Sequence, residues 1–329
     1  MKKFIFLIVI LIILFSGIYG LSARSYGKQR VFLIEEKILL KNLPEDITNL
    51  QIWIPAPIDD KWQKIDDFKV VSPFDFRIIT DKKYGNRIIY LKPKKIDLAT
   101  STSQIILSFK AQRKEYSASF DDPVAEESLS GFLQPNRLVP INGKIKALAR
   151  KITQGKSNDL ERVRAIYDYI INELTYSKDD PQVCGLGNSL LTLEFKKGIC
   201  TDYHSLFISL VRSLGIPAKF EIGLPIPIDK EEGVIKGYHC WAKFYLKDKG
   251  WIPVDISEAD KHPEKRDYFF GQIDENRVHF TTGRDIKLKY AKDSEPLNFF
   301  IYPYAEFNGW QFNNLDFEIS FKDFKGGGN

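Results

Sequence analysis

The chain has 329 residues, and 48 basic against 43 acidic side chains give it a formal net charge of +5. This length allows two modest domains, each with its own buried core. The small charge, without a Lys/Arg-rich patch or a Gly-rich phosphate loop, argues against a nucleic-acid partner.

The first 23 residues have the features of an export signal. Met1-Lys2-Lys3 is basic, residues 4–19 are almost wholly apolar, and small residues follow at 20–23. We expect a cleaved secretory signal, whose removal leaves a net charge of +3. An uncleaved anchor is the alternative, because the apolar run approaches membrane-spanning length. In either case the rest of the chain is predicted to be exported to the periplasm, the cell envelope or the medium.

Residues 24–119 are predicted to form a small β-sandwich. Short apolar or alternating runs occur between clusters of turn-forming residues, at 31–34, 50–54, 88–91 and 104–109. The module contains no histidine or cysteine. We therefore expect it to serve in packing or in positioning a substrate.

Helical patterns begin after a linker at residues 120–144, which is rich in turn-forming residues. Apolar residues recur at three- and four-residue intervals across residues 145–174. A loop at 179–188 then leads into a second helical stretch at 189–195. These helices are expected to pack around the helix that follows.

Cys200 stands at the start of that helix. Apolar residues recur with helical spacing over residues 203–214, and Gly215 and Pro217 then end the pattern. A thiol in the first turn meets unpaired backbone N–H groups and the positive end of the helix dipole. Both lower its pKa from the free value of about 8.5. Cys200 is therefore a candidate nucleophile.

A predicted hairpin supplies a base and a carboxylate to orient it. Two strands flank a turn at residues 247–250. If Tyr245 faces Trp251 across this turn, His239 and Asp255 become diagonal neighbours on one face, about 7–8 Å apart at the backbone. A register one residue shorter would put them on opposite faces, so we predict the longer loop or an equivalent bulge.

These motifs together resemble the bacterial transglutaminase-like domain, whose superfamily has a papain-like cysteine core. The resemblance covers roughly residues 145–285 and rests on Gly-Ile-Cys-Thr-Asp-Tyr at 198–203, Leu-Gly-Ile-Pro-Ala-Lys at 214–219, His-Cys-Trp at 239–241 and Gly-Trp-Ile-Pro-Val-Asp at 250–255. It implies an α+β fold with helices packed on an antiparallel sheet, preceded by the β-sandwich. The implied division is a leader or anchor at 1–23, a β module at 24–119, a linker at 120–144, a catalytic domain at 145–288, and C-terminal strands with a flexible tail at 289–329.

The resemblance implies acyl transfer through a thioester. Cys200 would attack an amide carbonyl of a peptide or protein, His239 would be the base, and Asp255 would hold the imidazole. The backbone N–H of Cys200 is an expected oxyanion donor. Hydrolysis is favoured over transamidation, because water is abundant and needs no second binding channel.

Four further residues are expected close to this site. Asn188 is a candidate second oxyanion donor. Asp202 is expected to cap the helix or to hold the neighbouring loop. His204 shares a helix face with Cys200 and is expected to make a structural hydrogen bond, and Trp241 is expected to be a buried core residue beside the base.

Two alternatives come from other classes of function. A zinc site could draw on Cys184, Cys200, His204, His239 and Cys240, but no CxxC or HxxxH pair occurs, so no metal or other cofactor is expected. The other is an inactive binding module in the cell envelope that keeps the fold. The odd number of cysteines leaves at least one thiol free, with Cys184 and Cys240 either bridged or both reduced.

Overall fold

The computed structural model describes residues 28–41, 49–93, 103–118, 128–292, 295–313 and 315–325. The predicted leader at 1–23 and the last residues of the predicted tail lie outside these ranges. Among the residues described, no helix is long and apolar enough to cross a membrane.

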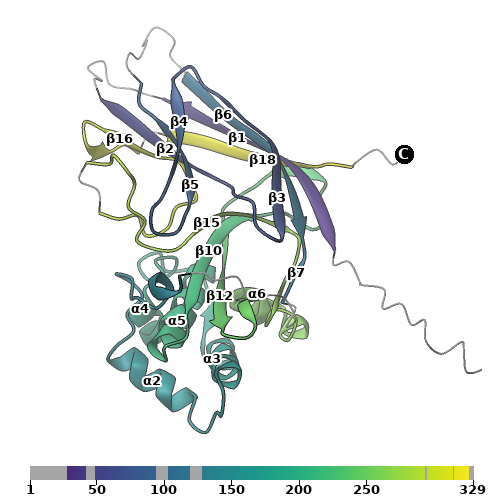
Figure 1. Ribbon diagram of the computed structural model, residues 1–329, viewed down its shortest axis with the longest axis vertical. Coiled ribbons are helices and arrows are strands. Elements are labelled where there is room, and N and C mark those ends of the chain that lie inside the picture. Colours follow the sequence, from purple (N-terminus) through teal and green to yellow (C-terminus); the bar gives the residue numbers. More distant parts are fainter. Residues whose placement is uncertain are drawn as a thin grey trace, which may run out of the picture.

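Two five-stranded antiparallel sheets form a β module at one end of the molecule (Figure 1), as the sequence predicted. Their orders are β11-β18-β1-β6-β3 and β17-β16-β2-β5-β4. The strands from the N-terminal part are β1 (Gln29–Leu40), β2 (Leu50–Ala56), β3 (Gln63–Val71), β4 (Phe76–Thr80), β5 (Arg87–Leu91) and β6 (Ser103–Lys114). Strand β1 alternates buried and accessible positions, whereas all seven residues of β2 are buried, so the sheets enclose a core between them.

The C-terminal strands complete both sheets. Strand β18 (Leu315–Asp323) pairs with β1, and β16 (Tyr304–Phe307) pairs with β2 and with the short β17 (Trp310–Gln311). The segments that the sequence suggested as separate parts therefore form one β module, assembled from both ends of the described chain.

The other end of the molecule holds the helices, which pack on a four-stranded antiparallel sheet of order β13-β12-β10-β15 (Figure 1). Its strands are β10 (Ala218–Pro225), β12 (His239–Leu246), β13 (Gly250–Val254) and β15 (Arg277–Thr282). The helices are α2 (Lys144–Ile152), α3 (Asp159–Glu173), α4 (Ser189–Phe195), α5 (Cys200–Ser213) and α6 (Ile256–Lys261). Every residue of α5 is buried. This α+β architecture confirms the predicted fold class.

Short elements connect these parts. They are β7 (Tyr116–Ser117) paired with β14 (Gln272–Ile273), β8 (Thr175–Tyr176) parallel to β9 (Lys197–Gly198), and the 3-10 turns η1 (Ser130–Phe132) and η2 (Pro263–Lys265). Strand β9 lies just before Cys200 in the chain, and its pairing with β8 fixes the path of the backbone into α5.

The segment between β10 and β12 returns to the β module. It contains β11 (Glu232–Val234), which pairs with β18 as an edge strand of the β module. Only residues 235–238 separate this strand from His239. The β module therefore fixes the chain directly before the predicted base.

One continuous hydrophobic core joins the β module to the helical part. The same cluster of buried residues includes Ile34 and Phe109 from the module and Leu206 and Phe207 from α5. Phe109 also packs edge-on against Phe280 of β15, with ring centroids 5.9 Å apart. The two parts are thus held together by apolar burial.

Candidate active site

Cys200 is the first residue of α5, as the sequence predicted, and is almost completely buried. The chain enters the helix through Gly198 and the extended N-cap residue Ile199. A Cβ atom on Gly198 would lie 2.4 Å from Cβ of Asp202, so only glycine fits at this position. Among the described residues, the backbone N–H of Cys200 makes no hydrogen bond. It is therefore available to a ligand at the helix start.

The carboxylate of Asp202 joins the helix start to the neighbouring loop. It accepts hydrogen bonds from the backbone N–H groups of Gly185 at 2.6 Å, Gly187 at 2.8 Å and Ile199 at 2.8 Å. Asp202 thus does both things that the sequence suggested: it caps α5 and holds the loop beside Cys200.

His239 and Asp255 lie in direct contact. Nε2 of His239 is 2.7 Å from Oδ2 of Asp255, and both side chains are buried. The hairpin has the predicted register, with Tyr245 opposite Trp251. The contact between His239 and Asp255 is short and buried, so it is a strong hydrogen bond between an imidazole and a carboxylate.

Asp255 lies just after the strand on which the sequence placed it. Strand β13 ends at Val254, and Asp255 is the N-cap of α6, accepting from the backbone N–H of Glu258 at 3.2 Å through Oδ1. The difference arises because the Asp255 N–H bonds to the carbonyl of Phe269, which ends the pairing with β12. One carboxylate oxygen therefore caps a helix while the other holds His239.

Arg277 is a member of the cluster that sequence reasoning missed. Its Nη1 donates to Oδ2 of Asp255 at 2.6 Å and its Nη2 donates to Oδ2 of Asp274 at 3.0 Å. Arg277 lies on β15, across β10 from the strand that carries His239. No motif spacing links it to Asp255, so only the sheet order reveals the contact.

The three central groups have complementary pKa shifts. A hydrogen bond from Cys240 and the contact with His239 outweigh burial and hold the pKa of Cys200 well below its usual value. Burial alone would lower the pKa of His239, but the Asp255 carboxylate and Cys200 raise it to about 10. Burial alone would raise the pKa of Asp255, yet His239 and Arg277 hold it well below its usual value. The arrangement favours the charged form of each group: a Cys200 thiolate, a His239 imidazolium and an Asp255 carboxylate.

His204 makes the structural hydrogen bonds expected of it. Its Nδ1 lies 2.7 Å from the carbonyl oxygen of Cys200, and its Nε2 accepts from the backbone N–H of Ile256 at 3.0 Å. Because Nε2 is an acceptor, the ring is neutral with its proton on Nδ1. Burial also lowers the pKa of His204. His204 thus joins the start of α5 to the start of α6, close to Asp255.

Cys240 lies next to Cys200, and the sequence offered only a zinc site or a disulfide as alternatives for it. Its Sγ is 3.7 Å from Nδ1 of His204 and 4.0 Å from Oγ1 of Thr201. Burial, with the contact to Cys200, raises the pKa of Cys240 well above its usual value. Cys240 therefore stays a thiol that can donate a hydrogen bond to Cys200.

All three cysteines are free, so Cys184 and Cys240 are not bridged.

Asn188 and Trp241 have structural roles. Oδ1 of Asn188 accepts from the backbone N–H groups of Leu190 and Leu191, so the residue caps α4, and this contact gives no support to the oxyanion role. Trp241 is fully buried and donates from Nε1 to Glu221 at 2.7 Å. It is a core residue beside His239, as expected.

Aromatic side chains from both parts of the molecule line up beside Cys200. The hydroxyl of Tyr238 is 2.9 Å from Oγ1 of Thr201, and its ring lies 6.1 Å from that of Tyr302. Tyr302 in turn packs on Phe317 of β18 at 4.8 Å. Through Tyr302, the β module therefore packs against the aromatic side chains near the start of α5. Within the described ranges, no group of three or more His, Cys, Asp or Glu side chains could hold a metal ion.

Comparison with known proteins identifies the domain. Residues 146–256 match the family model of the transglutaminase-like superfamily. A candidate cysteine protease from Cytophaga hutchinsonii has a similar structure, with a TM-score of 0.59 and 18% identity over 92% of this chain and 93% of that one. This likeness shows the fold. The match therefore supports a transglutaminase-like domain over residues 146–256.

Two relatives are also similar in sequence. An uncharacterized protein of Haemophilus influenzae is 26% identical over 82% of this chain and 83% of its own length. The protein YebA of Bacillus subtilis is 27% identical over 36% of this chain, which corresponds to 18% of YebA.

Proposed function

We propose that this protein is an exported thiol enzyme that acts on amide bonds through a thioester, with Cys200, His239 and Asp255 as its catalytic residues. The observation that carries the proposal is the buried 2.7 Å hydrogen bond between His239 and Asp255, together with the placement of Cys200 at the start of α5, where its thiol and the His239 imidazole favour each other's charged forms. A nucleophile, a base and an orienting carboxylate in this order are the groups that acyl transfer requires.

Acylation begins with the Cys200 thiolate attacking the carbonyl carbon of the substrate amide. The negative charge moves to the carbonyl oxygen, and the free N–H of Cys200 at the start of α5 is placed to stabilise it. When the carbon–nitrogen bond breaks, the His239 imidazolium gives its proton to the leaving amine. The acyl group is then held as a thioester on Cys200, and His239 is neutral.

Deacylation needs a second nucleophile. Neutral His239 takes a proton from water as the oxygen attacks the thioester, a carboxylic acid leaves, and the thiolate–imidazolium pair is restored. A primary amine in place of water would give a new amide. We propose hydrolysis, since water needs no second binding channel, and the candidate protease from Cytophaga hutchinsonii shares the fold.

We base the proposed location on the amino-acid pattern of residues 1–23. A basic start, an apolar stretch over 4–19 and small residues at 20–23 support export across a membrane. We propose that the enzyme acts on peptide or protein amides outside the cytoplasm.

The experiment that tests this function separates water from amine as the acceptor. A panel of peptide 4-nitroanilides and peptides is incubated in ¹⁸O-labelled water, with or without a fluorescent primary amine, and the products are weighed by mass spectrometry. Hydrolysis predicts ¹⁸O in the new carboxylates, and transamidation predicts the mass of the amine. Cys200→Ala is the matched control. Equal product formation by wild type and by this variant would refute the proposal.

A further inference from the structure

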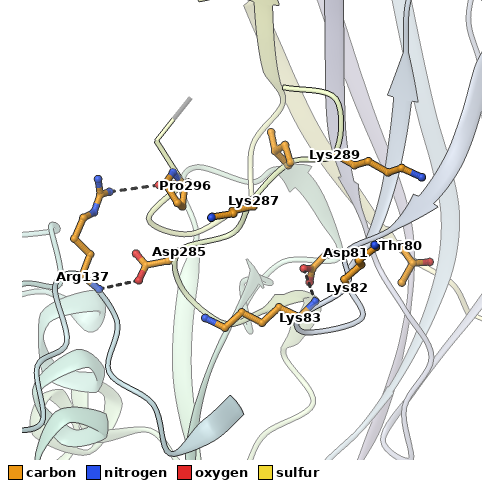
Figure 2. A pocket seen from close by; sticks show the side chains of 10 residues that line it. Thr80, Asp81, Lys82, Lys83, Arg137, Asp285, Lys287, Lys289 and Pro296 are labelled. Atoms are coloured by element: carbon orange, nitrogen blue, oxygen red, sulfur yellow. Dashed lines mark hydrogen bonds between the residues drawn. The ribbon is translucent and has the colours of Figure 1, made fainter. Parts of the chain in front are cut away.

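A second pocket, with a different lining, lies between the β module and the helical part. A pocket of about 770 Å³ lies between the hairpin that follows β4 and the chain that follows β15 (Figure 2). No residue of the Cys200 site lines it. Its charged lining is mainly basic and comprises Lys82, Lys83, Arg137, Lys287 and Lys289, with two acidic side chains, Asp81 and Asp285.

The two acidic groups are occupied by backbone donors. Asp81 accepts from the N–H groups of Lys83 at 2.9 Å and Tyr84 at 3.0 Å. Oδ2 of Asp285 accepts from the N–H of Arg137 at 2.7 Å. These carboxylates hold the loops in shape, and Arg137 is paired with Glu295, so the positive charge open to a ligand comes from the lysines.

Two lysines extend into the pocket from opposite walls. Figure 2 shows Lys83 and Lys287 both reaching toward the side where Arg137 and Asp285 lie, while Lys289 points away. Within the described part of the chain, neither Lys83 nor Lys287 has a carboxylate partner; Lys83 lies over the ring of Tyr84 at 4.8 Å. Like charges held around one hollow repel each other, and an anion relieves that repulsion.

The walls of the pocket are rigid. Asn86 exchanges two hydrogen bonds with the backbone of Thr282, at 2.7 and 2.8 Å, and the Tyr84 hydroxyl donates to the carbonyl of Arg284 at 2.9 Å. A Cβ atom on Gly283 would lie 2.3 Å from the Tyr84 ring, and the positive φ of this residue also favours glycine. The hairpin is therefore fixed against β15, and the pocket exists before any ligand arrives.

The size and lining indicate the chemistry of the ligand. The volume lies within the range of roughly 300–1,000 Å³ that is usual for small-molecule sites, which is larger than a bare phosphate ion needs. Leu288, Pro296 and the lysine stems add apolar surface beside the charges. Lysine and arginine are the residues that bind phosphate in proteins.

We propose that this pocket binds an organic phosphate, a phosphate ester carried on a body such as a glycerol or sugar unit. The ester could belong to a soluble molecule or to a lipid headgroup, since both present the same phosphate. In either case Lys83 and Lys287 would pair with the phosphate oxygens while the carbon body lies against Leu288 and Pro296.

The test measures binding to both sources of phosphate at low ionic strength. Glycerol 3-phosphate is titrated by calorimetry, and co-sedimentation is measured with phosphatidylglycerol and with phosphatidylcholine vesicles. The variant Lys83→Glu/Lys287→Glu is compared with Lys144→Glu/Lys247→Glu, which changes the net charge equally at exposed positions away from the pocket. Both pairs have exposed side chains, so both variants are expected to fold.

We expect wild type to bind, the pocket variant to bind at least tenfold more weakly, and the control variant to bind like wild type. Binding of glycerol 3-phosphate identifies a soluble ligand, and binding of phosphatidylglycerol vesicles alone identifies a headgroup. Cys200→Ala should bind like wild type, because the pocket does not depend on the thiol. Absence of binding to either probe, or equal loss in the two charge variants, would overturn the proposal.

Discussion

The imidazole of His239 lies between Cys200 and Asp255, and these two neighbours set its protonation. Asp255 raises the pKa of His239, and Cys200 and His239 favour each other's charged forms. Both shifts therefore favour a thiolate–imidazolium pair near neutral pH. Activity needs both members, the thiolate to attack and the imidazolium to protonate the leaving amine.

Loss of the His239 proton should set the alkaline limit of activity. With a raised pKa of about 10, His239 stays protonated through neutral pH, and the acylation rate should fall only as pH rises through that value. Asp255→Asn removes the main source of the raised pKa, so the alkaline limb should move to lower pH. The measurement is the rate of acylation against pH in both proteins. An alkaline limb at the same pH in both would show that Asp255 does not control the base.

Cys240 should tune the nucleophile. Its thiol donates a hydrogen bond that favours the Cys200 thiolate, so Cys240→Ala should raise the pKa of Cys200. Cys240→Ser keeps a donor of similar size and should leave that pKa closer to wild type. The check is the rate at which iodoacetamide alkylates Cys200 as a function of pH, followed by peptide mass. Identical profiles for the alanine and serine variants would exclude the donor role.

The residues that the sequence revealed differ in kind from those it did not. Cys200, His239 and Asp255 stand in local patterns, a helix start and a hairpin, whose geometry follows from spacing. Arg277 and Cys240 act through contacts between elements that are not neighbours in sequence. Such contacts depend on sheet order and helix placement, which no local pattern specifies.

At the scale of elements, the start of α5 depends on one buried carboxylate. Asp202 accepts three backbone hydrogen bonds, from Gly185, Gly187 and Ile199. These bonds hold the loop beside Cys200 and cap the helix that begins at this residue. The position of the thiol and that of its flanking loop are thus set by the same side chain.

Replacing this carboxylate should cost stability. Asp202→Asn keeps the shape but puts an NH₂ group against backbone donors, so we expect a loss of roughly 1–3 kcal/mol in the free energy of unfolding. Urea denaturation measures it. Asp229→Asn, at an exposed position, is the control and should stay within about 0.5 kcal/mol of wild type. Equal stability of the two variants would contradict the role given to Asp202.

The elements themselves were predictable to different degrees. The helix after Cys200 and the His239 hairpin follow from strong periodicity and turn signals. Strands β3 and β4 escaped prediction because they lie largely at the surface, and polar residues interrupt their apolar pattern. Strand β11 has three residues and exists only because β18 pairs with it. Strands of this kind are defined by their partners more than by their own sequence.

At the scale of the whole molecule, the β module and the helical part act as one body. They share a hydrophobic core, and β11 passes from the module's edge to the residues before His239. The sequence suggested a module that precedes the catalytic part. Its completion by β16 and β18 could not be predicted, because strands far apart in sequence pair only through tertiary structure.

A buried carboxyl in the β module should make stability depend on pH. Glu36 lies on β1 between the buried residues Ile34 and Ile38, and within the described structure its oxygens have no hydrogen-bond partner. Burial raises its pKa from 4.5 to about 8. The folded state therefore keeps a proton that the unfolded chain loses above 4.5. The stability from this proton is complete below pH 4.5 and is lost as pH rises through about 8.

Glu36→Gln removes this titration and retains the shape. The variant should gain stability relative to wild type on going from pH 5 to pH 8, by up to about 4 kcal/mol. Urea midpoints at the two pH values give the comparison. A constant offset between the two proteins would show that Glu36 does not titrate in this window.

The most direct test of the account is to trap the acyl-enzyme. The protein is mixed with 4-nitrophenyl acetate, quenched in acid within the first turnover and weighed intact, alongside Cys200→Ala and His239→Ala. We predict one acetyl group on Cys200 in wild type, none on Cys200→Ala and much slower labelling of His239→Ala. A folded wild-type protein that gains no acetyl group, or one that gains it as fast without Cys200, would contradict the assignment of Cys200 as the nucleophile.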